Sequence, residues 1–499
     1  MNFLNNIVNA ADLPPWLSFA LFALDIAVRI IAICWLPYNR KPVVALGWLM
    51  AIFLVPYVGF IAFLIFGSSQ LPKHRRARQR VMNEMIRENI DHDDNEVHPI
   101  LGNPPHITRK AKVAAQLNYR LGALPLVGGN KFTLHKDSHE AMWHMAQEID
   151  KAQKYVHFEF YITAYSGASV PLWDALFRAS ERGVKVRVLI DQLGTRKYPT
   201  YRKDLRKMLK ESSIEWHLML PINPLKGQWQ RPDLRNHRKI LVIDGVTAYS
   251  GSQNAIDACY DLTKNIKSGL LWKDLTYSCT GPIVEELNAV FISDWYSETK
   301  ELPLSEINSQ IPSINDGQLA QIVPSGPGFE TENNLRLINY LINNAEHRII
   351  ICSPYFVPES TLLQAITSAA LSNIDVEIIV TEKGDQFLPN MAQRSYYEEL
   401  LKAGVKIRQY PGPTVLHSKY MIIDDSYTFI GSSNMDPRSF ALNMEVSTYV
   451  VDQKMVRELD EISTEYISKC KTLRYDEWVN RPNRTKMVEN ICRLWSSLL

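Results

Sequence analysis

Two stretches of the chain carry the same polar residues at the same spacing. Residues 236–244 read NHRKILVID and are followed by GSQN at 251–254, while residues 416–424 read LHSKYMIID and are followed by GSSN at 431–434. Both obey His-x-Lys-x4-Asp-x6-Gly-Ser-x-Asn, and they lie 180 residues apart. One chance match to six fixed positions in a chain this long is on the order of one in 10^5. The chain therefore contains a duplicated chemical motif.

The residue types in this motif suit chemistry on a phosphodiester. In each copy, His and Lys alternate on an extended strand and so share one face. Two copies facing each other would supply a nucleophile, an acid and several donors for phosphate oxygens. The candidate catalytic residues are His237, Lys239, His417 and Lys419. The candidate phosphate-binding residues are Ser252, Asn254, Ser432 and Asn434, whose hydroxyl and amide groups can donate.

The aspartates of the motif, Asp244 and Asp424, belong to the same catalytic set by their fixed spacing. Each stands five residues beyond the lysine, past the apolar run of the strand. This distance favours a structural or supporting role over contact with the substrate.

Two further carboxylates stand where they can orient the histidines. Asp274 and Glu445 each precede a strand-like run, 275–279 and 446–451. We expect them to hydrogen-bond the two imidazoles and to set their tautomers. The alternative is a surface carboxylate at the start of a strand.

No metal or cofactor is expected, because the lysines can take the part of a cation at the phosphate. The six cysteines show no CxxC spacing, so neither a zinc site nor a disulfide framework is indicated.

The elements that would position these residues alternate between strands and helices. A strand, a helix and a second strand occur in that order in each half of the chain, which predicts βαβ units and largely buried sheets. The segments are 155–162, 170–182 and 184–190 in the first half, and 349–352, 361–372 and 376–381 in the second.

The motifs resemble those of the phospholipase D superfamily, and several longer stretches resemble the bacterial cardiolipin synthases in particular. These stretches are GSSNMDPRSFALNMEV at 431–446, SPYFVP at 353–358, VPSGP at 323–327 and the apolar anchor ending in Phe66-Gly67. The resemblance covers nearly the whole chain. In one departure, Gly251-Ser252 stands where many such synthases carry Gly-Gly.

The resemblance implies an α/β fold with two similar phospholipase D-type lobes, each a mixed sheet flanked by helices, after an N-terminal transmembrane helical hairpin. On this reading the hairpin occupies residues 1–70 and a charged juxtamembrane linker occupies 71–129. The first lobe then spans 130–312 and the second spans 313–499.

The resemblance also implies a phosphatidyl transfer between two phosphatidylglycerol molecules, giving cardiolipin and glycerol through a phosphatidyl-histidine. Family analogy makes His237 the nucleophile and His417 the acid and base, although the two motifs are symmetric. A phospholipase D that uses water as the acceptor is an alternative, and a superfamily nuclease is a more distant one.

The N-terminal region predicts two membrane spans. Residues 43–66 form a 24-residue run without charge, which as a helix reaches about 36 Å and can cross a hydrocarbon core of about 30 Å. Pro56 and Gly59 could kink this span or make it re-entrant. Residues 16–36 form the first span, in which Asp25 and Arg29 can pair; a helix on the lipid surface is the alternative.

The charge pattern bears on orientation and partners. Basic residues are denser after the second span than in the connector, which favours a cytoplasmic catalytic domain in a multi-pass protein of the bacterial inner membrane. The basic residues are Arg40 and Lys41 in the connector, and Lys73, Arg75, Arg76, Arg78 and Arg80 beyond it. An acidic stretch at 88–96 follows.

The whole chain has 499 residues and a net charge of +2, without the basic excess of a nucleic-acid binder. The expected partners are phosphatidylglycerol, other anionic phospholipids and the bilayer, with no nucleic acid. The sequence indicates no oligomeric state.

Overall fold

The computed structural model describes residues 14–38, 40–90, 100–101, 107–226, 228–307 and 314–495. Most of the acidic stretch at 88–96 lies outside these residues. The chain divides into two compact units, Met1–Gln70 and Leu71–Leu499, which we call the anchor unit and the catalytic unit.

The anchor unit contains the helices α2 (Pro15–Trp35), α3 (Pro42–Leu54) and α4 (Pro56–Phe66). Among the described residues, α2 is the one helix that is long and apolar enough to cross a membrane, by length and composition. Its charged residues pair on one face, with Arg29 Nε 2.8 Å from Asp25 Oδ2. This ion pair lowers the cost of placing two charges in an apolar segment.

The expected second span, 43–66, is not one uninterrupted helix, because it is interrupted just before Pro56, where the sequence allows a kink or a re-entrant turn. Val55 leaves the helical conformation (φ −136°, ψ 79°), and Pro56, which has no N–H to donate, begins α4. The chain then turns back, so that the two ends of the segment meet: Arg40 Nε, before α3, donates to Gly67 O, after α4, at 3.3 Å. With 13 and 11 residues, α3 and α4 are about 20 Å and 17 Å long, shorter than a hydrocarbon core.

A glycine permits this close return of α4 onto α3. A Cβ at Gly59 would lie 2.7 Å from Ala51 O and 2.9 Å from Ile52 Cα, so any larger residue would push the helices apart. The hairpin also packs on α2, since Tyr57 donates to Leu21 O at 3.1 Å and the rings of Trp35 and Phe63 meet edge to face at 5.4 Å. The structure therefore packs a short helical hairpin, α3 and α4, against one long helix, α2.

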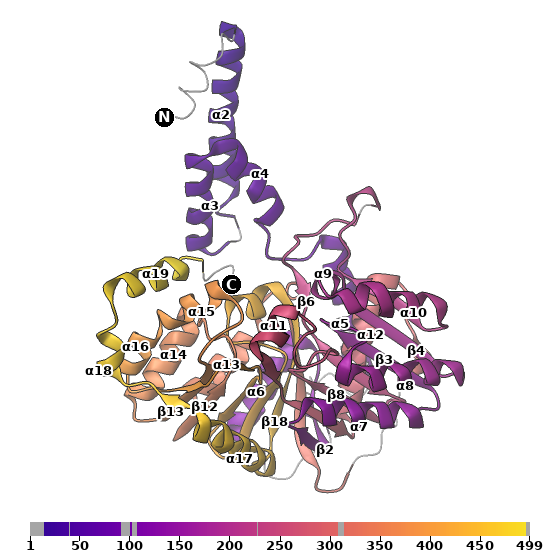
Figure 1. Ribbon diagram of the computed structural model, residues 1–499. Coiled ribbons are helices and arrows are strands. Elements are labelled where there is room, and N and C mark those ends of the chain that lie inside the picture. The colour runs from indigo at the N-terminus through magenta and orange to yellow at the C-terminus, as the bar shows by residue number, and fades with distance from the viewer. Residues whose placement is uncertain are drawn as a thin grey trace. The chain divides into compact units, whose positions relative to one another are not determined.

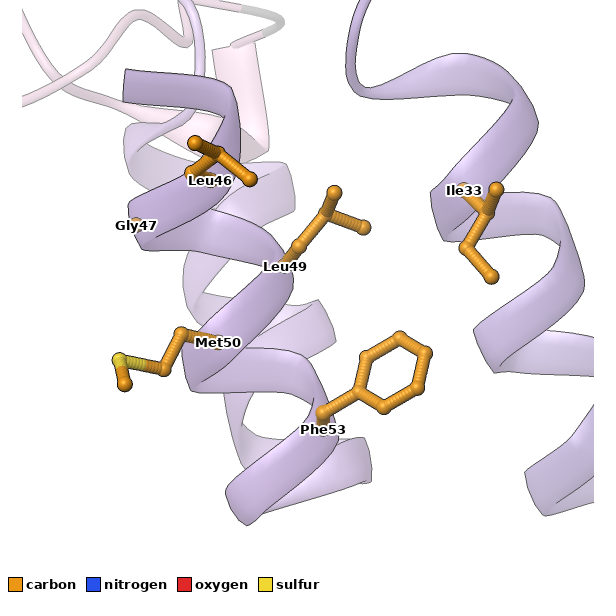
Figure 2. A pocket seen from close by; sticks show the side chains of 6 residues that line it. All are labelled: Ile33, Leu46, Gly47, Leu49, Met50 and Phe53. Carbon is orange, nitrogen blue, oxygen red and sulfur yellow. The ribbon is translucent and has the colours of Figure 1, made fainter. Parts of the chain in front are cut away.

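An open groove of about 490 Å³ lies on α2 and α3 (Figure 2). Its lining is entirely apolar: Ile33, Leu46, Gly47, Leu49, Met50 and Phe53. With no polar side chain it offers no donor or acceptor for phosphate chemistry, and it is suited to contact with acyl chains.

If the hairpin enters and leaves a membrane on the same side, the accessibility of introduced cysteines from each side of that membrane can be predicted. In a Cys34→Ala background, Tyr38→Cys and Ser69→Cys should react with an impermeant thiol reagent from the same side, because the ends of the hairpin meet. Trp16→Cys, at the other end of α2, should react from the opposite side. Labelling of positions 38 and 69 from opposite sides would show that 43–66 spans the membrane instead.

The catalytic unit is built on two copies of one sheet pattern (Figure 1). The first copy, lobe 1, has the strand order β5-β4-β3-β7-β8-β10-β2, and the second, lobe 2, has β14-β13-β12-β16-β17-β18-β11. In each copy the first three strands are parallel and the others antiparallel. An antiparallel pairing of β2 with β11 joins the two into one continuous sheet.

The strands of lobe 1 are β2 (Leu126–His135), β3 (Tyr155–Phe160), β4 (Lys185–Asp191), β5 (Glu215–Met219), β7 (Lys239–Ile243), β8 (Thr247–Gly251) and β10 (Thr276–Thr280). Those of lobe 2 are β11 (Gln318–Ser325), β12 (Arg348–Cys352), β13 (Asp375–Thr381), β14 (Lys406–Tyr410), β16 (Tyr420–Ile423), β17 (Tyr427–Gly431) and β18 (Asn443–Val451). The edge strands β1 (Ile100–Leu101) and β19 (Lys471–Thr472) pair with β2 and β14.

Helices cover the sheets because most of the central strands are buried along their length. The longer helices are α7 (Ser138–Lys151), α8 (Val170–Glu181), α12 (Ile283–Thr299), α13 (Asn333–Asn343), α14 (Ser360–Leu371) and α17 (Gln453–Lys469). The shorter ones are α9 (Gln192–Arg196), α10 (Arg206–Glu211), α11 (Thr263–Ser268), α15 (Phe387–Arg394), α16 (Tyr397–Lys402), α18 (Tyr475–Val479) and α19 (Asn483–Arg493). The expected α/β fold with two similar lobes is confirmed.

The segment expected as a charged linker, 71–129, instead contains two helices that pack onto the catalytic unit. In α5 (Lys73–Ile90), Arg75 forms a buried ion pair with Glu298 at 2.7 Å, and Arg78 donates to Ser297 O. In α6 (Arg109–Gly122) the alanines at 111, 114 and 115 are fully buried. Arg75 and Arg78 of the basic cluster in α5 therefore bind groups of the catalytic unit, whereas Lys73 and Arg80 are exposed.

Candidate active site

Two short parallel strand pairs connect the lobes at the positions of the histidines. Arg235–Asn236 (β6) pairs with β18 at Asn443–Met444, and His237 N donates to Met444 O at 2.8 Å. In the mirrored arrangement, Thr414–Leu416 (β15) pairs with Leu271–Lys273 (β9), and His417 N donates to Lys273 O at 2.8 Å. Each histidine is thus fixed by its backbone to the opposite lobe.

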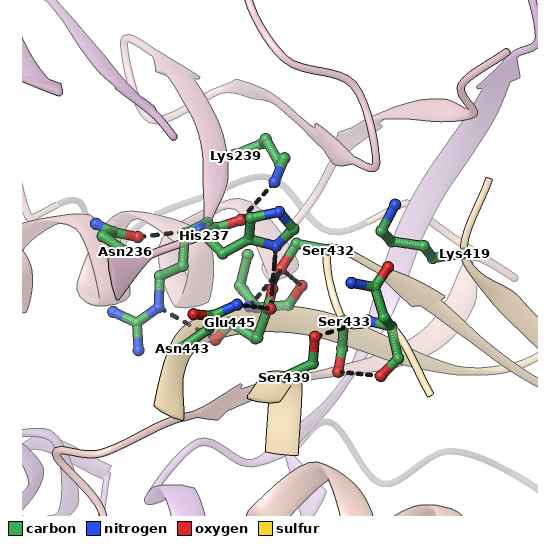
Figure 3. A network of polar contacts seen from close by, with 12 residues as sticks. Asn236, His237, Lys239, Lys419, Ser432, Ser433, Ser439, Asn443 and Glu445 are labelled. Carbon is green, nitrogen blue, oxygen red and sulfur yellow. Dashed lines mark hydrogen bonds and ion pairs between the residues drawn. The ribbon is translucent and has the colours of Figure 1, made fainter. Parts of the chain in front are cut away.

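This register places a carboxylate of the opposite lobe against each imidazole. His237 Nδ1 lies 3.0 Å from Glu445 Oε2, and His417 Nδ1 lies 2.6 Å from Asp274 Oδ1 (Figure 3 shows the first pair). These four residues were predicted from the sequence. That each histidine pairs with a carboxylate of the opposite lobe was not predicted. In both pairs Nε2 is the ring nitrogen that remains for a reacting group.

The motif serines hold these carboxylates. Ser252 Oγ donates to Asp274 Oδ1 at 2.7 Å, and Ser432 Oγ donates to Glu445. Ser252 and Ser432 were expected to bind phosphate, but in the structure their hydroxyl groups donate to the two carboxylates instead. The preceding glycine allows this approach, since a Cβ at Gly431 would lie 2.4 Å from Val446 O.

The lysines lie next to the histidines and are almost fully buried. Lys239 Nζ donates to His237 O at 2.6 Å, and Lys419 Nζ donates to His417 O at 2.7 Å. Burial lowers the pKa of Lys239 to about 7 and that of Lys419 to about 8, against the opposing attraction of nearby carboxylates. A phosphodiester anion between them would favour their charged forms and be held by them.

The two motif asparagines differ. Both polar atoms of the Asn254 amide have hydrogen-bond partners in the protein: Oδ1 accepts from Ile162 N at 3.2 Å and Nδ2 donates to Tyr260 Oη at 2.7 Å. Asn434 Oδ1 is buried and has no hydrogen-bond partner among the described residues. That oxygen can only accept a hydrogen bond, so a phosphate oxygen would have to be bound by the Nδ2 group of Asn434 instead.

The electrostatic surroundings of the two imidazoles also differ. Burial lowers the pKa of both histidines, that of His417 to about 4, and Lys239 and Lys419 add to this effect at each ring, while Arg438 adds to it at His237. Beside His417, the pKa of Asp274 lies below its usual range despite burial, because of the charge and hydrogen bond of that histidine. Beside His237, burial raises the pKa of Glu445 to about 7. Asp274 therefore stabilises an imidazolium more strongly than Glu445 does.

The motif aspartates lie at the far ends of their strands, about 16 Å from the lysines. Asp244 accepts from the backbone N–H groups of residues 153, 154 and 155 at 2.7–2.9 Å. Asp424 accepts from those of 346 and 347 and from Lys110 Nζ at 3.1 Å. Both carboxylates therefore hold the chain at the start of a central strand, β3 or β12, away from the histidines.

Three residues near the two motif histidines and their partners were not predicted from the sequence: Tyr161, Asp436 and Arg438. The Tyr161 ring lies edge-on to His237 at 4.8 Å, and Arg438 Nη2 donates to Asp233 O of lobe 1 at 2.7 Å. Asp436 is buried two residues before Arg438, and its pKa is raised to about 6 by burial. Aligning the two motifs would have found the last two, because lobe 1 has Ile256 and Ala258 at the equivalent positions.

Comparison with known proteins agrees with this geometry. A family model described as "Cardiolipin synthase, PLD-like domain" matches residues 145–295 and 338–466, more than half of the chain. The chain belongs to the cardiolipin synthase family. A second model, "Phospholipase_D-nuclease N-terminal", matches residues 26–68, which lie in the anchor unit. The resemblance drawn from the motifs is confirmed, and the chain is a phosphatidyltransferase of the phospholipase D type.

Its relatives match along nearly the whole length. Cardiolipin synthase A of Proteus mirabilis (strain HI4320) is 31% identical over 97% of this chain and 98% of its own. Cardiolipin synthase A of Edwardsiella ictaluri (strain 93-146) has the same identity and the same coverage. Among solved structures, the phosphatidylserine synthase of Haemophilus influenzae Rd KW20 shares the fold, with a TM-score of 0.58 and 18% identity over 79% of this chain and 100% of its own.

The unequal carboxylates predict unequal effects of their amide variants. Asp274→Asn should lower kcat by about 10²–10⁴-fold, because His417 loses the anion that stabilises its charged form. It should also move the limb on which activity falls with rising pH to lower pH, since the pKa of His417 drops further. Glu445→Gln should cost about tenfold, because that carboxyl is already close to half protonated near neutral pH. Full activity with an unchanged pH profile in Glu445→Gln would remove its positioning role.

The placement of Asp424 predicts a loss of stability rather than of chemistry. Asp424→Asn should lower the free energy of unfolding by about 2–3 kcal/mol, because a buried carboxylate accepts several N–H groups. The matched control is Asp425→Asn, whose exposed ion pairs contribute about 0–1 kcal/mol. Thermal unfolding in detergent measures both variants. Lost turnover with an unchanged Tm in Asp424→Asn would contradict the structural role.

Proposed function

We propose that this protein transfers a phosphatidyl group from one phosphatidylglycerol to another, giving cardiolipin and glycerol. One observation carries the proposal: two imidazoles, each with Nδ1 on a carboxylate of the opposite lobe, present Nε2 beside two buried lysines. This is a constellation for a two-step displacement at phosphorus. The printed names of the relatives, cardiolipin synthase A, support the same reaction.

In the first step Nε2 of neutral His237 attacks the phosphorus of the donor lipid. The bond from phosphorus to the glycerol oxygen breaks, and His417 as the imidazolium gives its proton to that oxygen. Lys239, Lys419 and the Nδ2 group of Asn434 donate to the non-bridging oxygens. The products are a phosphatidyl-His237 and free glycerol.

In the second step neutral His417 takes the proton from the glycerol hydroxyl of a second phosphatidylglycerol. The resulting oxygen attacks phosphorus, the P–N bond breaks, and cardiolipin leaves with both histidines restored to their starting states. The assignment of roles follows from the carboxylates. Ionised Asp274 suits a histidine that must carry a proton, and Glu445, which is about half protonated near neutral pH, holds less negative charge beside the histidine that must stay unprotonated at Nε2.

The anchor unit supports a location in the bacterial inner membrane. Residues 1–14 contain no basic residue, whereas Arg40, Lys41 and the basic residues of α5 all follow α2. If α2 crosses once and the hairpin re-enters from its C-terminal side, the positive charge lies on the side of the catalytic unit, which favours the cytoplasm.

Incubation with pure phosphatidylglycerol in vesicles tests the reaction. Cardiolipin and glycerol should appear in equal amounts, while phosphatidate without cardiolipin would show that water is the acceptor and overturn the proposal. A rapid quench under alkaline conditions, followed by peptide mapping, should recover the phosphatidyl group on the peptide containing His237. Its recovery on the peptide containing His417 would reverse the two roles.

A further inference from the structure

The last described helix, α19, has a polar residue on its inner side. Glu489 is fully buried and pairs with Arg394 Nε at 2.8 Å and with Arg481 Nη2 at 2.7 Å. Cys492, one turn further along, is also buried. A charged contact on this side fixes the helix to lobe 2 and sets which residues point outward.

The outward side of α19 and of the residues just after it carries several exposed apolar side chains, together with the exposed polar residues Asn483, Arg484 and Asn490. Leu494 is 80% exposed and Trp495 55% exposed, and Met487 and Ile491 are more than half exposed. Two exposed residues of the neighbouring helix α15, Phe387 and Leu388, add to the set. We call these six residues the α15–α19 surface. An amphipathic helix with its apolar side turned outward is unusual in a soluble protein and marks a contact site.

The α15–α19 surface connects to the active site through hydrogen bonds. Gln393 of α15 accepts from Phe356 N at 3.0 Å. The segment that contains Phe356 is bonded to Met435, the residue after Asn434: Met435 N donates to Ser353 Oγ at 3.1 Å, and Val357 N donates to Met435 O at 2.9 Å. One short path of contacts thus joins the surface to the second motif.

A second apolar projection occurs on lobe 1. The loop closed by hydrogen bonds between Asn223 and Gln228 carries Leu225, which is 99% exposed, and is followed by the half-exposed Trp229. In Figure 1 this loop and α19 both lie at the upper edge of the catalytic unit. Both lobes therefore carry exposed apolar side chains outside their cores.

The composition of this surface indicates the partner. Of the basic residues of α19, Arg484 is exposed, whereas Lys486 and Arg493 lie 3.7 Å and 4.0 Å from Glu398 and Glu399 of α16. Apolar and aromatic side chains with an exposed cation beside them suit a helix that lies in the interface of a bilayer. The substrate of the proposed reaction is itself a bilayer lipid, so a bilayer is the occupant that this surface fits.

We propose that the α15–α19 surface docks the catalytic unit on a bilayer of anionic phospholipid, with its apolar side chains at the level of the headgroups. Tyr355, next to Phe356, donates to Asp385, and Gln386 donates to Tyr355, just before α15 begins. Docking there brings the lipid surface next to the segment that supports the second motif. The inference goes beyond the proposed reaction, because it concerns how a lipid reaches the site and not which lipid is transferred.

Photocrosslinking of the full chain in phosphatidylglycerol vesicles tests the docking. A photoreactive benzoyl-phenylalanine at position 491 or 495 should form adducts with lipids that carry labelled acyl chains. The matched control is position 246, where an exposed Val lies in the turn between β7 and β8, at the end of β7 far from Lys239. Adducts with a second copy of the protein, no adducts, or equal lipid adducts at all three positions would overturn the proposal.

A functional measurement separates docking from chemistry. The double variant Ile491→Asp, Trp495→Asp should lower turnover of phosphatidylglycerol in vesicles at least about tenfold, yet leave turnover of a dispersed short-chain phosphatidylglycerol within about twofold. Val246→Asp should change neither. An equal loss on both substrates would contradict a docking role. If the unmodified chain makes cardiolipin from neither substrate, the proposed function fails, while the crosslinks still decide the docking.

Discussion

The contact between each catalytic imidazole and a carboxylate of the other lobe is the constraint on which the site depends. It exists because β6 pairs with β18 and β9 pairs with β15, so that the backbone of each histidine is bonded to the residue before its carboxylate. The joined sheet, the close approach at Gly251 and Gly431, and the serines that hold the carboxylates all serve this register. Neither lobe can complete a site alone.

The two His–carboxylate pairs stand on a nearly symmetric scaffold, but the charges and hydrogen bonds around them differ. Asp274 keeps its negative charge beside His417, whereas burial leaves Glu445 about half protonated near neutral pH beside His237. Asp436 and Arg438 occur in lobe 2 without equivalents in lobe 1, and Asn434 has a buried acceptor free where Asn254 does not. The distribution of charge and of satisfied hydrogen bonds, rather than the motif, distinguishes the halves.

Local patterns in the sequence predicted the fold and most of the site. Strand and helix positions such as β3, α8 and β4 follow from apolar runs and turn residues, and the distance of Asp244 from Lys239 indicated its structural role. Contacts between distant segments could not be predicted in this way. The crossing of the His–carboxylate pairs, the serine contacts and the folding back at Val55 depend on register and packing, which a single sequence does not encode as a pattern.

The strand pairs between lobes have a consequence for the origin of the chain. A single ancestral lobe could have formed the same two histidine–carboxylate contacts only as a symmetric dimer, in which both half-sites were identical by necessity. Joining two copies in one polypeptide removed that necessity, because a substitution could then enter one half without entering the other. The differences between Asp274 and Glu445, and between Ile256 and Asp436, are of this kind. In a chain that carries both lobes, the two histidines can therefore have different carboxylate partners and different surroundings.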